Sequence, residues 1–94
     1  MKKKFVEIEI LSELINKPIV KMSERKYPGV LIQGDSLILL YDLAKEISEK
    51  AKDTDNYELH EISNELEILL YEYIEHYEKV LEENKIELPY NRVV

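Results

Sequence analysis

The chain has 94 residues, of which 45% are hydrophobic and 35% charged, with two glycines, three prolines and no cysteine. These values exclude two independent domains, a disordered chain and any disulfide or cysteine-based metal site. The net charge of −7 is uneven: residues 1–54 hold 10 basic and 9 acidic side chains, whereas residues 55–94 hold 3 and 11. This acidic half repels nucleic acid and anionic lipid, so we expect neither as a partner and favour a basic protein. The alternative is that the charge only maintains solubility.

The start of the sequence does not predict membrane targeting. The longest apolar run, Leu37 to Tyr41, is far shorter than the ~20 residues that cross a bilayer. Met1 to Lys4 resembles the basic start of a signal peptide, but Glu7 and Glu9 interrupt the apolar stretch that must follow. Together with the absence of cysteine, these features lead us to expect a cytoplasmic protein.

Three short strands are predicted in the first third of the chain. Phe5 to Leu11 alternates apolar and acidic residues with the period of a half-buried strand. Ile19 to Met22, a short and partly β-branched run after the loop Asn16 to Pro18, is predicted to be the second strand. Tyr27 to Val30 has Pro and Gly in the order typical of a type II turn. The chain should therefore reverse there and continue as a third strand, Val30 to Gln33.

A first helix is predicted over residues 36–52. Its apolar residues recur at steps of three and four, which places them on one face. Asp35 or Ser36 can cap its first turn. Residues 53–56 interrupt the pattern, so the helix should end before them.

A second, longer helix is predicted over residues 55–84, without Gly or Pro inside it. Asp55 and Glu58 have the spacing of a capping box at its start. Residues 85–94, which include Pro89, follow as a tail.

These elements predict a single α+β domain over residues 1–94, with a three-stranded antiparallel meander (1–33) followed by an antiparallel helical hairpin, in the order βββαα. The sheet's apolar face is expected to pack on the hairpin and bury Val6, Ile8, Ile10, Val20, Val30, Ile32, Leu40, Ala44, Ile47, Leu59, Ile62 and Leu66. The second helix is longer by about 20 Å, so roughly its last three turns should extend past the first. Those turns carry Tyr73, Ile74, Tyr77, Val80 and Leu81. The tail, the sheet or another chain must cover them, and a second copy is the simplest form of the last option.

Gly34 to Leu37 is the tetrapeptide after which the GDSL hydrolases are named, and it lies between a predicted strand and helix as in that family. Those enzymes require a later Asp-x-x-His for the general base, and none occurs here. His60 and His76 are the two imidazoles, and both lie on the acidic helix. We therefore interpret the tetrapeptide as a strand end followed by a helix cap, and a hydrolase or an anion-binding turn remains the alternative.

Glu72 and His76 are four residues apart on the second helix, with Glu75 beside them, so a carboxylate and an imidazole could share a face as metal ligands do. Two ligands do not make a site, and the first helix offers only Asp42, Glu46 and Glu49 to complete one. No metal or other cofactor is predicted.

The predicted partner-binding residues are interleaved tyrosines and glutamates on the second helix. They are Tyr71, Glu72, Tyr73, Glu75, Tyr77 and Glu78. Tyrosine supplies contact area at low entropic cost and is enriched at interface hot spots. The alternative is that the tyrosines form a packing stripe at helical spacing.

Residues 25–37 read Arg-Lys-Tyr-Pro-Gly-Val-Leu-Ile-Gln-Gly-Asp-Ser-Leu. This run resembles the signature of a family of small uncharacterised bacterial proteins, in which a basic-aromatic-Pro-Gly turn precedes Gln-Gly-Asp-Ser-Leu and an amphipathic helix. The signature positions are Tyr27, Pro28, Gly29, Gln33, Gly34, Asp35 and Ser36. The resemblance implies no activity and leaves open whether these positions are structural or functional. In size and acidity such proteins resemble the immunity proteins that neutralise bacterial toxins.

The leading hypothesis is a non-enzymatic interaction protein, expected to be a homodimer, whose acidic helix binds a basic partner such as a toxin. The first alternative is a small hydrolase or anion-binding enzyme centred on the turn at Gly34 to Leu37. The second is a structural homodimer with no further ligand.

Overall fold

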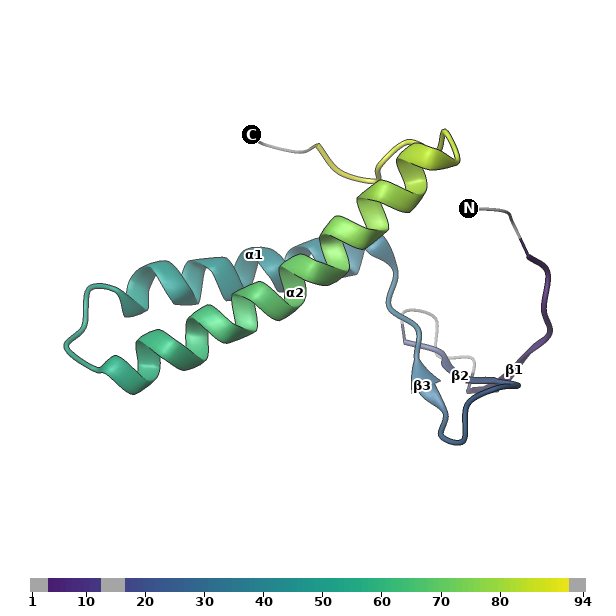
Figure 1. Cartoon of the computed structure of the whole chain (residues 1–94), viewed down its shortest axis with the longest axis horizontal. Helices are drawn as coiled ribbons and strands as arrows, with labels where there is room; N and C mark the ends of the chain where they lie inside the picture. The colour runs from purple at the N-terminus through teal and green to yellow at the C-terminus, as the bar shows by residue number, and fades with distance from the viewer. Residues whose placement is uncertain (1–3, 13–16, 92–94) are drawn as a thin grey trace. The chain divides into compact units, whose positions relative to one another are not determined.

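The computed structural model describes residues 4–12 and 17–91 (Figure 1). Its elements are β1 (Ile8–Ser12), β2 (Ile19–Met22), β3 (Gly29–Val30), α1 (Gly34–Ala51) and α2 (Tyr57–Glu83). The predicted α+β class is confirmed, since a three-stranded antiparallel sheet precedes two helices that pack against each other. By its internal contacts the chain divides into two compact units, Met1–Gln33 and Gly34–Val94.

The three strands form one antiparallel sheet in the order β1-β2-β3. The register of the first two strands pairs Ile8 with Met22, Glu9 with Lys21 and Ile10 with Val20. Apolar pairs therefore share one face, and the opposite charges of Glu9 and Lys21 meet on the other. Leu11 is an extra residue in β1, because Ile10 and Ser12 pair with adjacent residues of β2. It forms a β-bulge. The predicted loop before β2 begins at Asn16, which lies outside the described residues.

The chain reversal between β2 and β3 differs from the predicted turn at Tyr27 to Val30. The amide of Arg25 donates to the carbonyl of Met22 at 3.1 Å, so the tight turn comes directly after β2. Gly29 lies in β3 opposite Val20 and does not have the positive φ that a type II turn requires. The prediction was wrong because a Pro-Gly pair also suits the start of an edge strand, where proline's missing donor is not needed. The third strand accordingly begins and ends earlier than predicted.

Helix α1 begins at Gly34, two residues before the predicted start. The carboxylate of Asp35 accepts the amide of Ser36 at 2.9 Å, and Asp35 favours the first turn through the helix dipole. At the other end, the hydroxyl of Thr54 donates to the carbonyl of Ala51 at 2.7 Å. This bond satisfies one of the carbonyls that a helix end leaves without an intrahelical partner.

Helix α2 is capped by Asn56, whose side chain accepts the amide of Leu59 at 3.1 Å. The predicted capping box of Asp55 and Glu58 was wrong by one position, because asparagine caps a helix as well as aspartate does. The helix ends at Glu83. Lys85 then adopts a positive φ of 57°, and the amide of Ile86 donates back to the carbonyl of Leu81 at 2.9 Å. The tail is thereby turned back toward the helix.

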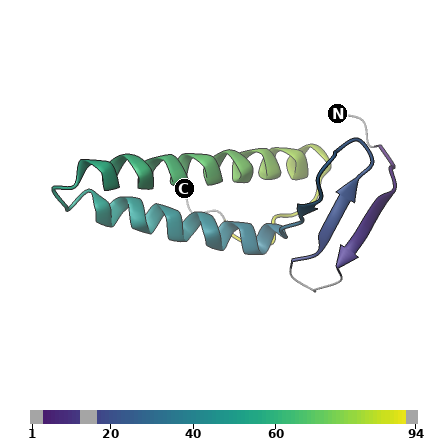
Figure 2. The same cartoon turned by 90° about the horizontal axis from the view of Figure 1, so that it is seen from below.

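The two helices pack antiparallel (Figure 2). The seam between them consists mostly of small side chains. On α1 the buried residues of this seam are Leu37, Ala44, Ser48 and Ala51, and on α2 they include Ser63 and Ile74. The hydroxyl of Ser63 donates to the carbonyl of Leu59 at 2.6 Å, so it is satisfied within its own helix. Within the described residues, neither helix is long and apolar enough to cross a membrane.

Most side chains expected in a core between sheet and helices are exposed in the structure. Ala44 is buried and Val20 is half-buried. The exposed residues are Val6, Ile8, Ile10, Val30, Ile32, Leu40, Ile47, Leu59, Ile62 and Leu66. Helix α1 contains two series of residues with helical spacing. The mostly small series, Leu37, Ala44, Ser48 and Ala51, forms the contact with α2, whereas the large residues Leu40, Leu43 and Ile47 are exposed.

Candidate functional site

The last turns of α2 extend past α1 by less than predicted. The ring of Tyr77 lies against Gly34, the first residue of α1, so only residues after 77 continue beyond it. Ile74 is 2% exposed, Tyr77, Val80 and Leu81 are half-buried, and Tyr73 is exposed. The tail returns beside these turns, with Leu88 and Tyr90 half-buried. The sequence predicted that the tail, the sheet or another chain would cover these turns. Within the 34–94 unit, the tail is the segment that lies beside them.

Gly34 is required by this packing. A Cβ at this position would occupy the same space as the Cζ, hydroxyl and Cε2 atoms of the Tyr77 ring. The presence of glycine at this position of the Gln-Gly-Asp-Ser signature is therefore explained by packing, because an aromatic ring approaches the helix backbone too closely for any side chain.

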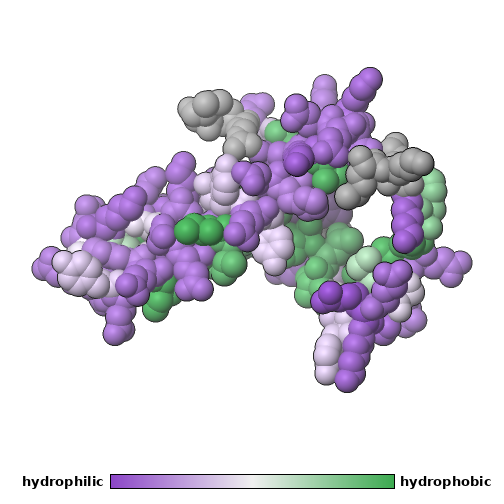
Figure 3. All heavy atoms as spheres, viewed as in Figure 1, coloured by the Kyte–Doolittle hydropathy of each residue, from purple (hydrophilic) through white to green (hydrophobic). Residues whose placement is uncertain are grey.

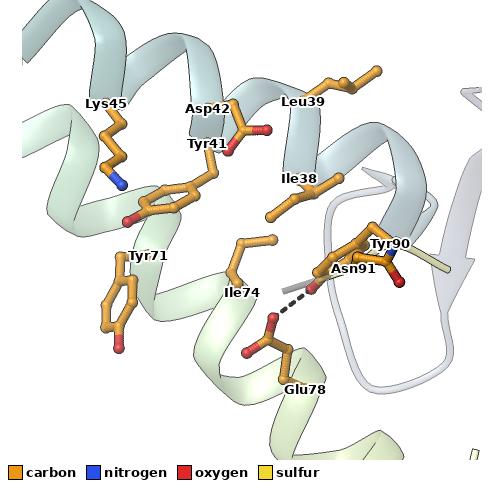
Figure 4. A pocket seen from close by; sticks show the side chains of 10 residues that line it. All are labelled: Ile38, Leu39, Tyr41, Asp42, Lys45, Tyr71, Ile74, Glu78, Tyr90 and Asn91. Atoms are coloured by element: carbon orange, nitrogen blue, oxygen red, sulfur yellow. Dashed lines mark hydrogen bonds between the residues drawn. The ribbon is translucent and has the colours of Figure 1, made fainter. Parts of the chain in front are cut away.

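A groove of about 320 Å³ lies between α1, α2 and the tail (Figure 4). Its lining includes Ile38, Tyr41, Asp42, Lys45, Tyr71 and Tyr90. The rings of Tyr41 and Tyr71 meet with centroids 5.8 Å apart and an angle of 48° between their planes. This arrangement provides aromatic surface next to an acidic and a basic side chain, which suits the recognition of a polar segment of a protein.

A hydrogen bond from the Tyr90 hydroxyl to Oε2 of Glu78, 2.8 Å long, joins the tail to α2 within the lining of the groove (Figure 4). Glu78 is 9% exposed. Burial raises the pKa of the Tyr90 phenol above its ordinary value of 10.0, and the nearby Tyr77 and Asp42 add to this rise. The neutral phenol is therefore the favoured form in the folded chain.

Tyr90→Phe is expected to lower the free energy of unfolding by about 1 kcal/mol, because it removes a donor to a buried carboxylate. The raised pKa makes this contribution fully present below the ordinary pKa of a tyrosine. It is lost as the pH rises through the raised value. Urea unfolding followed by circular dichroism at neutral and strongly alkaline pH measures both effects. The wild type should lose more stability than the variant between these conditions. Tyr73→Phe, at an exposed tyrosine, is the control and should behave as wild type.

The predicted partner-binding residues are divided among different surroundings. Tyr71 and Glu78 line the groove, and Tyr77 packs against Gly34. Glu72, Tyr73 and Glu75 are exposed. Sequence reasoning did not single out Tyr41, Lys45, Tyr90 and Asn91, which also line the groove. Tyr41 and Lys45 are four residues apart on α1 and therefore share a face, but no spacing links the tail residues Tyr90 and Asn91 to the helices.

The signature positions also have different surroundings. In the 1–33 unit, Pro28, Gly29 and Gln33 are exposed, as is Tyr27, whose ring centroid lies 5.3 Å from Nζ of Lys26. In the 34–94 unit, Gly34 is buried, Asp35 exposed and Ser36 half-buried. Among the described residues, the hydroxyl of Ser36 makes no hydrogen bond with a histidine. The imidazole of His60 instead bonds the carbonyl of Thr54 at 2.8 Å.

The described part of the chain contains no group of three histidine, aspartate or glutamate side chains placed to hold a metal ion. Glu72 and His76, which share the spacing of metal ligands, are both exposed. They therefore remain a pair without a third ligand among the described residues.

Fold and site together define a small α+β protein whose helical hairpin bears a groove bordered by its own tail. The chain belongs to a family of unknown function, DUF6959, which matches residues 1–90. The expectation of an uncharacterised family is thereby confirmed. No curated protein and no solved structure gives a significant match.

Proposed function

We propose that this chain is a non-enzymatic interaction domain of the immunity type, in which the acidic helix α2 binds a basic protein partner. The observation that carries the proposal is the charge of α2, which holds nine glutamates and one lysine. Glu67 is half-buried and Glu78 is buried, whereas the other seven glutamates are exposed. A helix surface of this composition attracts a basic protein over long range and accelerates encounter.

Aromatic side chains lie among these carboxylates and provide contact surface after encounter. Tyr57 is 79% exposed, and Tyr71 is half-buried in the groove. Tyrosines that combine apolar area with a hydroxyl are typical of binding hot spots. The attraction therefore comes from the glutamates, and the stability of the complex from the tyrosines.

The double variant Glu72→Lys, Glu75→Lys is expected to slow association with the partner by about tenfold at low salt, because it reverses charge at two exposed positions of α2. The partner is first identified by crosslinking in the source cells, and its association rate constant is then measured by surface plasmon resonance over a range of NaCl concentrations. The wild-type rate should fall steeply as salt increases.

The matched control is Glu7→Lys, Glu24→Lys, which makes the same change of charge at exposed positions in the 1–33 unit. It should alter the association rate much less than the α2 variant. A wild-type rate that does not depend on salt, or equal effects of the two double variants, would contradict the proposal.

A further inference from the structure

Large apolar side chains form two exposed stripes on the helical hairpin. On α1 the stripe consists of Leu40, Leu43 and Ile47. On α2 it consists of Leu59, Ile62, Leu66, Leu69 and Tyr73. All are between 38% and 65% exposed, and they recur at steps of three and four residues. Figure 3 shows hydrophobic residues on the hairpin between hydrophilic ones.

The two stripes lie on the same side of the hairpin. Four of the eight stripe residues immediately precede a buried seam residue: Leu43 and Ile47 precede Ala44 and Ser48, and Ile62 and Tyr73 precede Ser63 and Ile74. The other four, Leu40, Leu59, Leu66 and Leu69, precede half-buried residues. One residue earlier in an α-helix is a rotation of about 100° away from the seam. Because the helices run antiparallel, the same rotation within each helix turns both stripes toward one side. We call this side the apolar face.

The opposite side of the hairpin has a different character. The residues that follow the buried positions Leu37, Ala44, Ser48 and Ala51 are Ile38, Lys45, Glu49 and Lys52, and those that follow Ser63 and Ile74 on α2 are Asn64 and Glu75. All except the half-buried Ile38 are exposed and polar, as expected of a surface in contact with water. The exposed stripes of large apolar side chains therefore lie on one side of the hairpin, and the opposite side is mostly polar.

We propose that a second copy of this chain packs on the apolar face, so that two hairpins form a four-helix bundle. With eight large side chains about half accessible, the face offers on the order of 700 Å² per copy, close to the ~800 Å² that each partner contributes to a specific interface. No stripe residue is charged, and one apolar surface can be buried against its own copy by a two-fold axis. Steps of three and four are the spacing with which helices of such bundles interdigitate.

The internal seam gives an energetic reason for this pairing. The buried apolar residues are Leu37, Ala44, Ala51 and Ile74 among those described, and two of these are alanines. Large leucine and isoleucine side chains thus remain outside the hairpin's own core, and burying one fully is worth ~1.5–3 kcal/mol. Dimerisation would make the apolar face the main core of the assembly.

This inference goes beyond the proposed function and is tested without the basic partner. Sedimentation velocity of the full chain over a wide range of concentrations should give a species of twice the 11.2 kDa chain mass. Ile62→Glu places a carboxylate on the apolar face and should weaken dimerisation by about a hundredfold. The matched control is Ile68→Glu on the same helix. Ile68 is also exposed, but it lies outside both stripes, so this variant should dimerise as wild type.

Crosslinking provides a second measurement that does not depend on how Ile62→Glu folds. The chain has no cysteine, so single cysteines can be introduced at Leu43, Ile62 or Ile68. A short bismaleimide should join two chains through Leu43→Cys and Ile62→Cys, and not through Ile68→Cys. Because both copies are acidic, added NaCl should leave dimerisation unchanged or strengthen it, opposite to its effect on a basic partner.

A chain that stays monomeric at every concentration, a larger assembly, or equal crosslinking at all three positions would overturn the dimer. Loss of the dimer on Ile68→Glu would also overturn it. None of these results affects the proposed binding of a basic partner. Conversely, failure to find such a partner leaves the dimer measurements valid.

Discussion

Ile74→Ala is expected to lower the free energy of unfolding by about 3 kcal/mol, the largest effect of a single core substitution in the helical hairpin. Among the described residues, Ile74 is the large side chain that is essentially fully buried, at 2% exposure. It is a residue of α2 that lines the groove between α2, α1 and the tail (Figure 4). Truncation would remove transfer free energy and leave a cavity in a small core that has few other large residues.

Urea denaturation at one fixed protein concentration measures this loss. The matched control is Ile68→Ala on the same helix, where the side chain is 48% exposed. That substitution should cost less than about 1 kcal/mol, because much of the side chain is already in contact with water. Equal losses for the two variants would mean that the packing around Ile74 is different from that described.

Gly34→Ala is expected to destabilise the chain by about 1–3 kcal/mol, although alanine is the better helix former. The added methyl group would overlap the ring of Tyr77, so the ring must move out of its position against α1. The expected sign is therefore opposite to that of most glycine-to-alanine substitutions at helical positions. Thermal unfolding followed by circular dichroism measures it.

A double-mutant cycle identifies the cause of this effect. In the Tyr77→Ala background the ring is absent, so Gly34→Ala should lose its cost and become neutral or stabilising. Gly29→Ala is the control for a general effect of the substitution, because a Cβ there meets no atom within 4 Å. If Gly34→Ala costs the same with and without Tyr77, the clash is not its origin.

Much of the fold could be predicted from the sequence, because local patterns determine the type of each element. Alternation in β1 and helical spacing in α1 and α2 depend on neighbouring residues, and the element order followed from them. The wrong predictions concern residues that suit two different local structures equally well. Pro28-Gly29 fits a type II turn and also an edge strand, and Asn56 caps a helix as well as Asp55 does.

The candidate site was less predictable because it depends on which helix faces meet. Tyr71 and Tyr77 were singled out by composition, and their spacing places them on different faces of α2. It does not say what each face meets, which is Tyr41 for the one and Gly34 for the other. The bond from Tyr90 to Glu78 joins the tail to a helix 12 residues earlier, after a sharp turn. No periodic pattern extends across that turn.

The bulge at Leu11 also affects how the sheet meets other molecules. In the described sheet β1 is an outer strand, so one border of its backbone has no neighbouring strand. Such a border invites the strands of other chains to add to it, which leads to aggregation. The extra residue disrupts the regular spacing of amides and carbonyls, and the exposed charge of Glu9 makes addition of a further strand costly. The outer border of the sheet thus resists indiscriminate growth by strand addition, whatever the helical hairpin binds.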